Sequence, residues 1–283
     1  MDSLDLLRLI LTKQKTPTKI IIKVKTMAIG FNSPTDTIGY VGNGAAIASL
    51  VSKTTGKPVG GFANLGMLSS ASFSITNDKV EMQDTMSGTM GVVMSKTVKT
   101  TVEVTLNLKS LSPENVARGT SGTVVRDAAA TGKIFTDLAY KGKSIVPDGV
   151  IASVESIEAD GLALVEGEDY MVSDGHIYFP ETTSIEDGTE VTVTYSTSAT
   201  KRVEALTTGD VELCIVFDGR NFAYENTPVK VTMYNVSLSP LSQRQLIGSD
   251  FGEMELKGTL QLARHVTGTG LSRYFKEEHV EIA

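Results

Sequence analysis

The segment VKTTVEVTLNLK, residues 98–109, alternates strictly between two kinds of side chain. One side carries Val98, Thr100, Val102, Val104, Leu106 and Leu108, and the other carries Lys99, Thr101, Glu103, Thr105, Asn107 and Lys109. A period of two predicts a β-strand with one buried face. Such a strand spans about 40 Å at ~3.3 Å per residue, about twice the usual length. We therefore expect it to belong to a large barrel-like assembly whose sheets continue from one subunit to the next.

A second alternating segment, GMLSSASFSIT, ends at Thr76 and is predicted to pair with this strand. The connection between them, residues 76–97, is long for a compact domain. It carries four methionines at a spacing of four, Met82, Met86, Met90 and Met94. The glycines of this connection argue against a helix. Two interpretations stay open: a hairpin folded onto its own core, or a flexible Met-bearing loop that contacts a neighbouring subunit.

The composition favours a mainly β protein. Val, Thr, Ser and Gly are frequent among the 283 residues, Trp is absent, and turn residues recur at short intervals. The only cysteine, Cys214, lies in an apolar run and is interpreted as a small buried side chain, which fits a reducing compartment. No segment reaches the ~20 apolar residues of a membrane span, and no standard signal peptide is recognised, so we expect a soluble protein.

Charge divides the chain into parts. Residues 1–26 carry six Lys or Arg and two Asp and are interpreted as an N-terminal arm, or as an extension upstream of a second start at Met27. Residues 144–200 carry twelve Asp or Glu and no Lys or Arg. Acid-Gly pairs suited to hairpin turns separate their short strands, which predicts an inserted acidic β-sandwich. A core domain would then comprise residues 27–143 and 201–283.

One helix and several later strands complete the predicted core domain. Ser112-Pro113-Glu114 predicts the start of a helix that ends near Arg118, and VVRDAAATGK, from Val124, allows a second short helix. Strands are expected at residues 211–217, 229–238 and 254–262. The alternation in the second of these changes parity near Tyr234-Asn235, which predicts a β-bulge.

The sequence predicts no catalytic, cofactor-binding or metal-binding residues. The three histidines have no metal-ligand spacing and no proximity in sequence to Cys214. The Gly-rich segment from Gly42 lacks the third glycine of a dinucleotide fingerprint, and Lys57 is followed by Pro58, which a P-loop does not allow. We therefore expect a protein that is not an enzyme.

The order of these parts resembles the major tail tube proteins of long-tailed bacteriophages. The resemblance covers residues 61–119 and 209–263 and rests on the succession of a strand (LSSASFSIT), a long loop, a strand (VKTTVEVTLNLK), a helix (SPENVARG) and later strands (VELCIVFDG and PVKVTMYNVSLSP). It implies a tail-tube β-sandwich or barrel with one flanking helix. Residues 144–200 resemble the extra Ig-like β-domain that members of the family often carry.

The resemblance also implies a function. Subunits would form hexameric rings that stack into a virion tail tube assembled in the host cytoplasm, through which DNA passes without specific binding during ejection. Its partners would be the tail terminator, the tail tip or baseplate proteins and the tape measure protein. The Met-bearing loop would reach the next ring, and Thr101, Glu103, Thr105 and Asn107 are candidates for the strand face that lines the lumen.

Two alternatives remain. A surface adhesin or receptor-binding β-sandwich protein would show similar strands, but a secretion signal would be expected. A carbohydrate-active β-sandwich enzyme would need clustered aromatic side chains, and aromatic residues make up only 6% of the chain.

Overall fold

The structure is a computed structural model that describes residues 39–88 and 90–280. The predicted arm at residues 1–26 therefore lies outside the described residues. Among the described residues, strands account for 57% and helix for 3%, which makes the protein mainly β, as predicted. None of the helices in the described part of the chain is long and apolar enough to cross a membrane.

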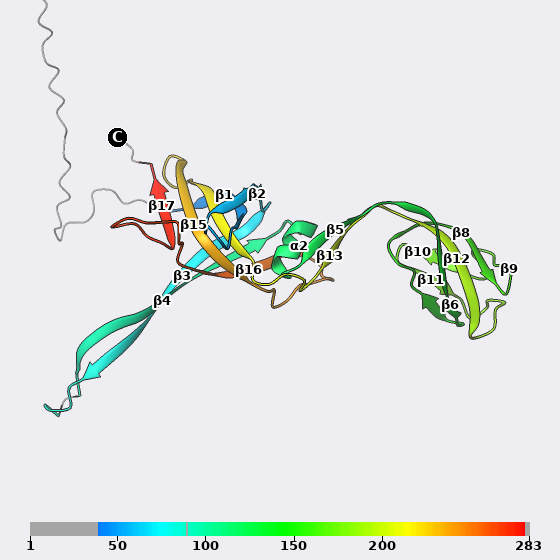
Figure 1. The fold of residues 1–283 in the computed structure, drawn as a ribbon, viewed down its shortest axis with the longest axis horizontal. Coiled ribbons are helices and arrows are strands. Elements are labelled where there is room, and N and C mark those ends of the chain that lie inside the picture. The colour runs from blue at the N-terminus through cyan, green and yellow to red at the C-terminus, as the bar shows by residue number, and fades with distance from the viewer. Residues whose placement is uncertain (1–38, 89, 281–283) are drawn as a thin grey trace, which may run out of the picture. The chain divides into compact units, whose positions relative to one another are not determined.

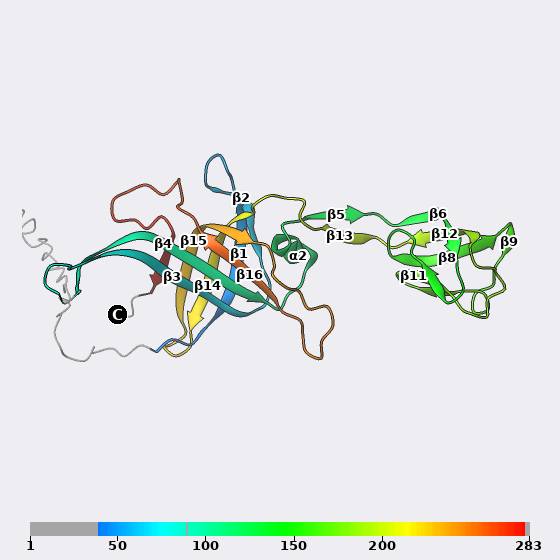
Figure 2. The same cartoon turned by 90° about the horizontal axis from the view of Figure 1, so that it is seen from below.

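In the described residues, eight strands form the largest sheet (Figures 1 and 2). Its order is β2-β1-β14-β15-β16-β4-β3, and β17 pairs with β15 outside this path. The strands are β1 (Gly42–Val51), β2 (Pro58–Asn64), β3 (Leu68–Gln83), β4 (Val92–Leu108), β14 (Glu212–Asn221), β15 (Thr227–Ser239), β16 (Met254–Leu260) and β17 (Phe275–His279). Neighbouring strands of this sheet pair in antiparallel fashion.

This sheet folds over a single apolar core because β15 changes partner along its length. Its first half, Val229–Met233, pairs with β17, and its second half, from Val236, pairs with β16. Between the halves, Tyr234 and Asn235 stand opposite one residue of β14, which is the predicted β-bulge. Buried residues of β1 and β14 then share one cluster with those of β4 and β16, which gives the sandwich.

The pairing of β3 with β4 is confirmed, and both strands are longer than predicted. Ala71 lies opposite Leu106 and Phe73 opposite Val104. β3 has 16 residues and β4 has 17, so most of the connection expected at residues 76–97 is strand. The prediction of a long loop was therefore wrong. Polar residues such as Asn77, Asp78 and Lys79 hid the strand because neither side of this ribbon is buried.

The predicted helix is confirmed as α2, Pro113–Gly119, with Ser112 as its N-cap. The Ser112 Oγ accepts a hydrogen bond from the Asn115 backbone N–H at 3.3 Å. The second helix, at residues 124–133, was wrong. Its residues form β5 (Thr123–Asp127) and the start of β6 (Ala130–Ala139), because pairing with later strands outweighs the helical preference of three alanines.

A second apolar core lies within residues 139–195 and shares no residue with the first. Two sheets surround it, with orders β6-β12-β8-β9 and β10-β11-β7. The additional strands are β7 (Lys143–Ile145), β8 (Ile151–Ala159), β9 (Leu162–Ala163), β10 (Met171–Ser173), β11 (His176–Phe179) and β12 (Thr189–Thr197). Because β6 belongs to the first of these sheets, the unit begins near Ala130, upstream of the expected start at residue 144.

A two-stranded ribbon links this inserted unit to the main sandwich. β5 pairs with β13 (Thr200–Glu204), and Asp127 lies opposite Thr200. Lys201 Nζ lies 2.7 Å from Glu114 Oε1, which ties the ribbon to α2. The two chain connections therefore enter and leave the inserted unit side by side.

Candidate functional site

The outer half of the β3–β4 hairpin is exposed on both faces. In β4, residues 102, 104, 106 and 108 are buried, whereas residues 92–100 are exposed. All four predicted methionines lie in this outer half: Met82 and Met94 are opposite each other, and Met86 and Met90 lie in the turn. Their exposed fractions are 55%, 61%, 96% and 67% in that order. The hairpin is therefore not folded onto its own core.

Asp84 organises the turn of this hairpin. Its carboxylate accepts hydrogen bonds from the backbone N–H groups of Met86 (2.7 Å) and Ser87 (3.1 Å) and from the Ser87 hydroxyl. The Ser87 hydroxyl, followed by the two backbone donors, lowers the pKa of Asp84 from its usual 3.8. The turn thus presents its methionines from a fixed loop that carries a negative charge at neutral pH.

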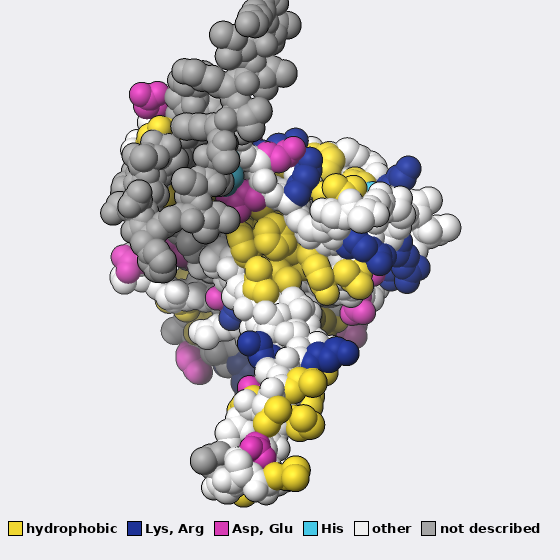
Figure 3. All heavy atoms as spheres, turned by 90° about the vertical axis from the view of Figure 1, so that its left-hand side faces the viewer, with side chains coloured by type: hydrophobic (Ala, Val, Ile, Leu, Met, Phe, Trp, Pro, Cys, Tyr) yellow, Lys and Arg dark blue, Asp and Glu magenta, His cyan; other side chains and the backbone are white. Residues whose placement is uncertain are grey.

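A bulge in β4 moves the apolar side of the hairpin from one face to the other. Asp78 lies opposite Lys99 and Lys79 opposite Thr97, so Val98 is the extra residue. Before the bulge, the apolar side chains of β3 are at odd positions, Phe73 and Ile75. Beyond it they are at even positions, Val80 and Met82. Side chains alternate between the two faces of a strand. The apolar side chains in the outer half of the hairpin therefore lie on the face that carries polar side chains in the inner half. Figure 3 shows hydrophobic side chains along the projecting hairpin.

The four predicted lumen candidates share the polar face of β4. Thr101, Glu103, Thr105 and Asn107 alternate with the buried residues of that strand. Their partners in β3 and β16 are Thr76, Ser74, Ser72, Ser70, Thr259, Lys257 and Glu255. Asn107 donates a hydrogen bond from Nδ2 to Ser70 Oγ at 2.8 Å. The structure therefore brings the four together in one hydroxyl-rich surface.

Two lysines of this polar face are paired with glutamates, and Glu103 adds one further carboxylate. Lys257 Nζ lies 2.7 Å from Glu255 Oε1, and the pKa of Lys257 is raised by its hydrogen bond to Glu255. Lys109 Nζ lies 3.8 Å from Glu253 Oε1 at the end of the same face. These exposed pairs contribute little stability, but they leave the face close to electrical neutrality.

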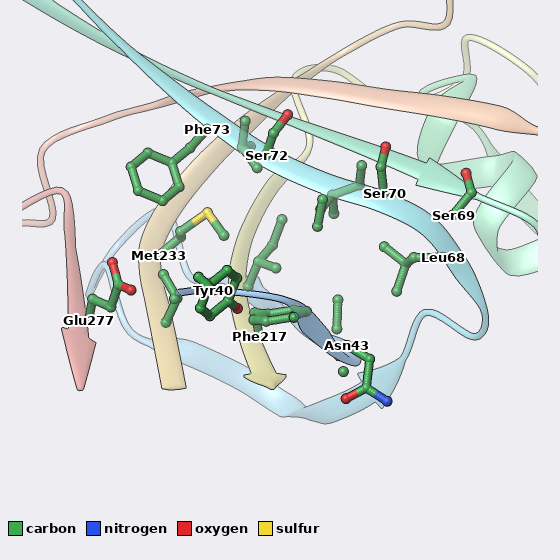
Figure 4. Close-up of a pocket in the computed structure, with 18 residues that line it drawn as sticks. Tyr40, Asn43, Leu68, Ser69, Ser70, Ser72, Phe73, Phe217, Met233 and Glu277 are labelled. Carbon is green, nitrogen blue, oxygen red and sulfur yellow. The ribbon is translucent and has the colours of Figure 1, made fainter. Parts of the chain in front are cut away.

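An open cavity of about 540 Å³ lies between β3 and the layer formed by β1, β14 and β15. Figure 4 shows Phe73, Met233 and Tyr40 directed into it, whereas the hydroxyls of Ser70 and Ser72 point away. Phe73 also contacts the ring of Phe275 at a centroid distance of 4.8 Å. Core residues such as Val104, Leu106 and Ile215 line the cavity together with polar residues such as Asn43 and Glu277, so it is an open end of the sandwich core.

Comparison with known proteins places this architecture in a family. Residues 39–278 match the family described as Protein of unknown function UCP028589. The chain belongs to this family. The match includes the whole β3–β4 hairpin and the inserted unit. No curated protein sequence matches it.

The cysteine and the histidines of the described residues are dispersed. Cys214 is buried, and burial raises the pKa of its thiol to about 11. His279 Nε2 lies 2.9 Å from Glu277 Oε1, and His265 contacts the ring of Tyr234 edge-on. Within the described residues, no group of three or more His, Cys, Asp or Glu could hold a metal ion.

One exposed apolar segment was not predicted from the sequence. It is the β15–β16 loop, defined here as residues 240–253, in which Leu246, Ile247 and Phe251 are 80%, 92% and 94% exposed. The signal was present in the segment QLIGSDFG, where large apolar residues stand between turn formers. The apolar residues of this segment follow neither the period of a strand nor that of a helix, so they predict no secondary structure.

Proposed function

We propose that this protein is the subunit of a phage-type tail tube, in which copies form hexameric rings and the rings stack into a conduit for DNA. The observation that carries the proposal is the β3–β4 hairpin. The inner half of β4 closes the sandwich, and the outer half of the hairpin exposes apolar side chains on a ribbon with no core of the described residues beneath it. Exposed apolar surface of this kind marks a contact with another molecule.

The sheet edges support closure into a ring. β3 and β2 are the two ends of the main sheet order, and β3 presents 16 residues at an edge that pairs with no further strand of the described residues. A long free edge is a hazard for uncontrolled aggregation unless another strand pairs with it or covers it. Interfaces that join different surfaces of successive copies close into rings when the rotation permits. A ring would pair or cover these edges in every copy.

The polar face of β3, β4 and β16 suits the wall of a DNA conduit. Lysine or arginine groups on such a wall would bind phosphates and retain the DNA. Here the wall would consist of Ser, Thr and Asn with lysines that are already paired to glutamates. We therefore assign Thr101, Glu103, Thr105 and Asn107 to the lumen in the proposed tube.

The remaining features of the proposal follow from the tail tube architecture. The inserted acidic unit would be displayed on the outer surface, away from the DNA. The tube would contact a tail terminator at one end, a tip or baseplate at the other and a tape measure protein inside. The protein would be located in the virion tail and would assemble in the host cytoplasm.

Electron microscopy of the purified protein tests this function. We expect sixfold rings or tubes with a central channel. β4 spans about 56 Å, and a barrel tilt of about 35–45° gives an axial repeat of about 40–46 Å. A protein that stays monomeric at all concentrations, with its hairpin packed on its own body, would overturn the proposal. Glycan binding by such a monomer would favour the surface adhesin instead.

A further inference from the structure

The β15–β16 loop is held at both ends while its middle is exposed. At its start, the Leu241 backbone N–H donates to the Gly119 carbonyl oxygen at 2.7 Å, at the end of α2. At its end, Glu253 accepts a hydrogen bond from Ser69 Oγ at 2.8 Å and pairs with Lys109. Between these anchors, Leu246, Ile247 and Phe251 are almost fully exposed. The loop is therefore an anchored apolar surface whose three large side chains are not covered by any described part of the chain.

This loop lies at the far end of the strands that carry the methionines. The β15–β16 loop leads into Met254, which is opposite Leu108, the last residue of β4. The hairpin turn joins the other ends of β3 and β4. Figures 1 and 2 both show the hairpin turn and the β15–β16 connection at opposite ends of the sheet. Because β4 spans about 56 Å, the two apolar surfaces of one chain cannot contact each other.

We propose that the hairpin turn of one copy, residues 83–88 and 90–92, docks on the β15–β16 loop of the next copy along the stack. This inference rests on the proposed function, and it names the surface that receives the Met-bearing turn. The two surfaces differ in composition and position, so their contact is head-to-tail. A head-to-tail contact that does not close repeats without limit and builds a filament of rings.

The chemistry of the two surfaces is complementary. Met86 and Met90 are flexible and can fit the irregular surface around Phe251, and thioether sulfur makes favourable contacts with aromatic rings. The loop carries Arg244, and the turn carries the ionised Asp84. A contact between these two charges would set the orientation of the turn on the loop.

Cysteine cross-linking of the full chain tests this contact directly. The natural Cys214 is buried and does not interfere. We would introduce Met86→Cys and Ile247→Cys together and oxidise the assembled protein. A head-to-tail contact predicts a ladder of covalent dimers, trimers and longer chains. When Met86→Cys and Ile247→Cys are carried by separate proteins, their mixture should yield covalent dimers that contain one copy of each.

Two controls make the result specific. Met86→Cys combined with Leu162→Cys, an exposed site in the inserted unit, should give no ladder. Phe251→Arg should raise the protein concentration needed for stacking by about tenfold to a hundredfold, because an apolar contact is lost. Phe222→Arg, the same change at another exposed phenylalanine, should leave stacking unchanged.

The outcomes separate this inference from the function on which it rests. Stacked rings in the microscope without the ladder, or a ladder from Met86→Cys paired with Leu162→Cys, would overturn the docking site and leave the tail tube proposal standing. Covalent dimers from Met86→Cys alone, without a ladder from the double variant, would show a contact between two turns and would also overturn it. A native chain that forms neither rings nor stacks would overturn both.

Discussion

Met82 and Met94 face each other directly across β3 and β4, and more than half of each side chain is exposed. The Val98 bulge puts them on the side of the hairpin that is polar nearer the sandwich. A pair of facing methionines with no core beneath it adds nothing to the packing of the monomer. We propose that its physical role is contact with another molecule, which can be tested separately from folding.

Serine at both positions should weaken assembly and leave folding intact. Burial of a methionine contributes about 1.5–3 kcal/mol, so the double variant Met82→Ser and Met94→Ser should raise the concentration needed for stacking at least tenfold. Sedimentation and electron microscopy measure the assembly, and urea denaturation measures the monomer. Met171→Ser, at a similarly exposed methionine of the inserted unit, is the matched control. Equal assembly of both variants would contradict the role of the pair.

Arginine on the polar face should make the proposed channel retain DNA. In Thr101→Arg with Thr105→Arg, we expect tubes that bind DNA at low salt, with a salt dependence that steepens by about 0.9 for each added phosphate contact. The native tube should not bind. The control, Thr192→Arg with Thr194→Arg, changes β12 of the inserted unit. DNA retention that is the same in both variants would show that β4 does not face the lumen.

The inserted unit should be removable without loss of the main sandwich. Asp127 and Thr200 are paired, so an Asn-Gly turn in place of residues 128–199 closes β5 and β13 as a hairpin. The two apolar cores share no residue, which means that the shortened chain keeps its whole first core. We expect cooperative unfolding and assembly as in the full chain. Loss of the near-ultraviolet circular dichroism signal would show that the units depend on each other.

Gly258 should be needed for the packing of β16 against β15. A Cβ at this position would lie 2.5 Å from Val236 Cγ1 and 2.9 Å from the Ser237 carbonyl oxygen. Gly258→Ala should therefore destabilise the protein by about 1–3 kcal/mol in urea denaturation. Gly175→Ala is the control, since a Cβ there meets nothing within 4 Å. Equal stability of the two variants would contradict the close approach of the strands.

Cys214 should be inert in the folded protein and should make stability fall at high pH. Burial raises the pKa of its thiol from 9.0 to about 11. Below pH 9 the thiol is neutral in both states, and between pH 9 and 11 only the unfolded chain ionises, which favours unfolding. Cys214→Ser should lack this component of the pH dependence. Titration with a thiol reagent at pH 8 should find one reactive thiol per chain in denaturant and almost none without it.

Local patterns in the sequence predicted the elements whose signal is contained within a few residues. The strict alternation of residues 98–109 predicted the buried face of β4, because side chains alternate wherever one face is covered. The Ser112 N-cap predicted α2. The change of parity at Tyr234-Asn235 predicted the bulge, since an extra residue shifts every following side chain to the other face.

The same reasoning failed where no core imposes a pattern. Residues 77–83 and 92–97 are strand, yet both faces are exposed, so their sequence carries no alternation to detect. β17 and the start of the inserted unit at β6 were also missed, because their pairing partners lie far along the chain. The β15–β16 loop has exposed apolar residues but no period.

Sequence alone thus determined that this protein is mainly β, that residues 98–109 form an amphipathic strand and that one helix follows it. Those properties depend on the chemistry of residues that are close together in the sequence. Tertiary structure decided that four methionines project beyond the core, that four polar residues of β4 share a surface with β3 and β16, and that a second apolar surface lies at the other end. These relationships arise from long-range pairing and its register, which bring together residues that no local pattern connects.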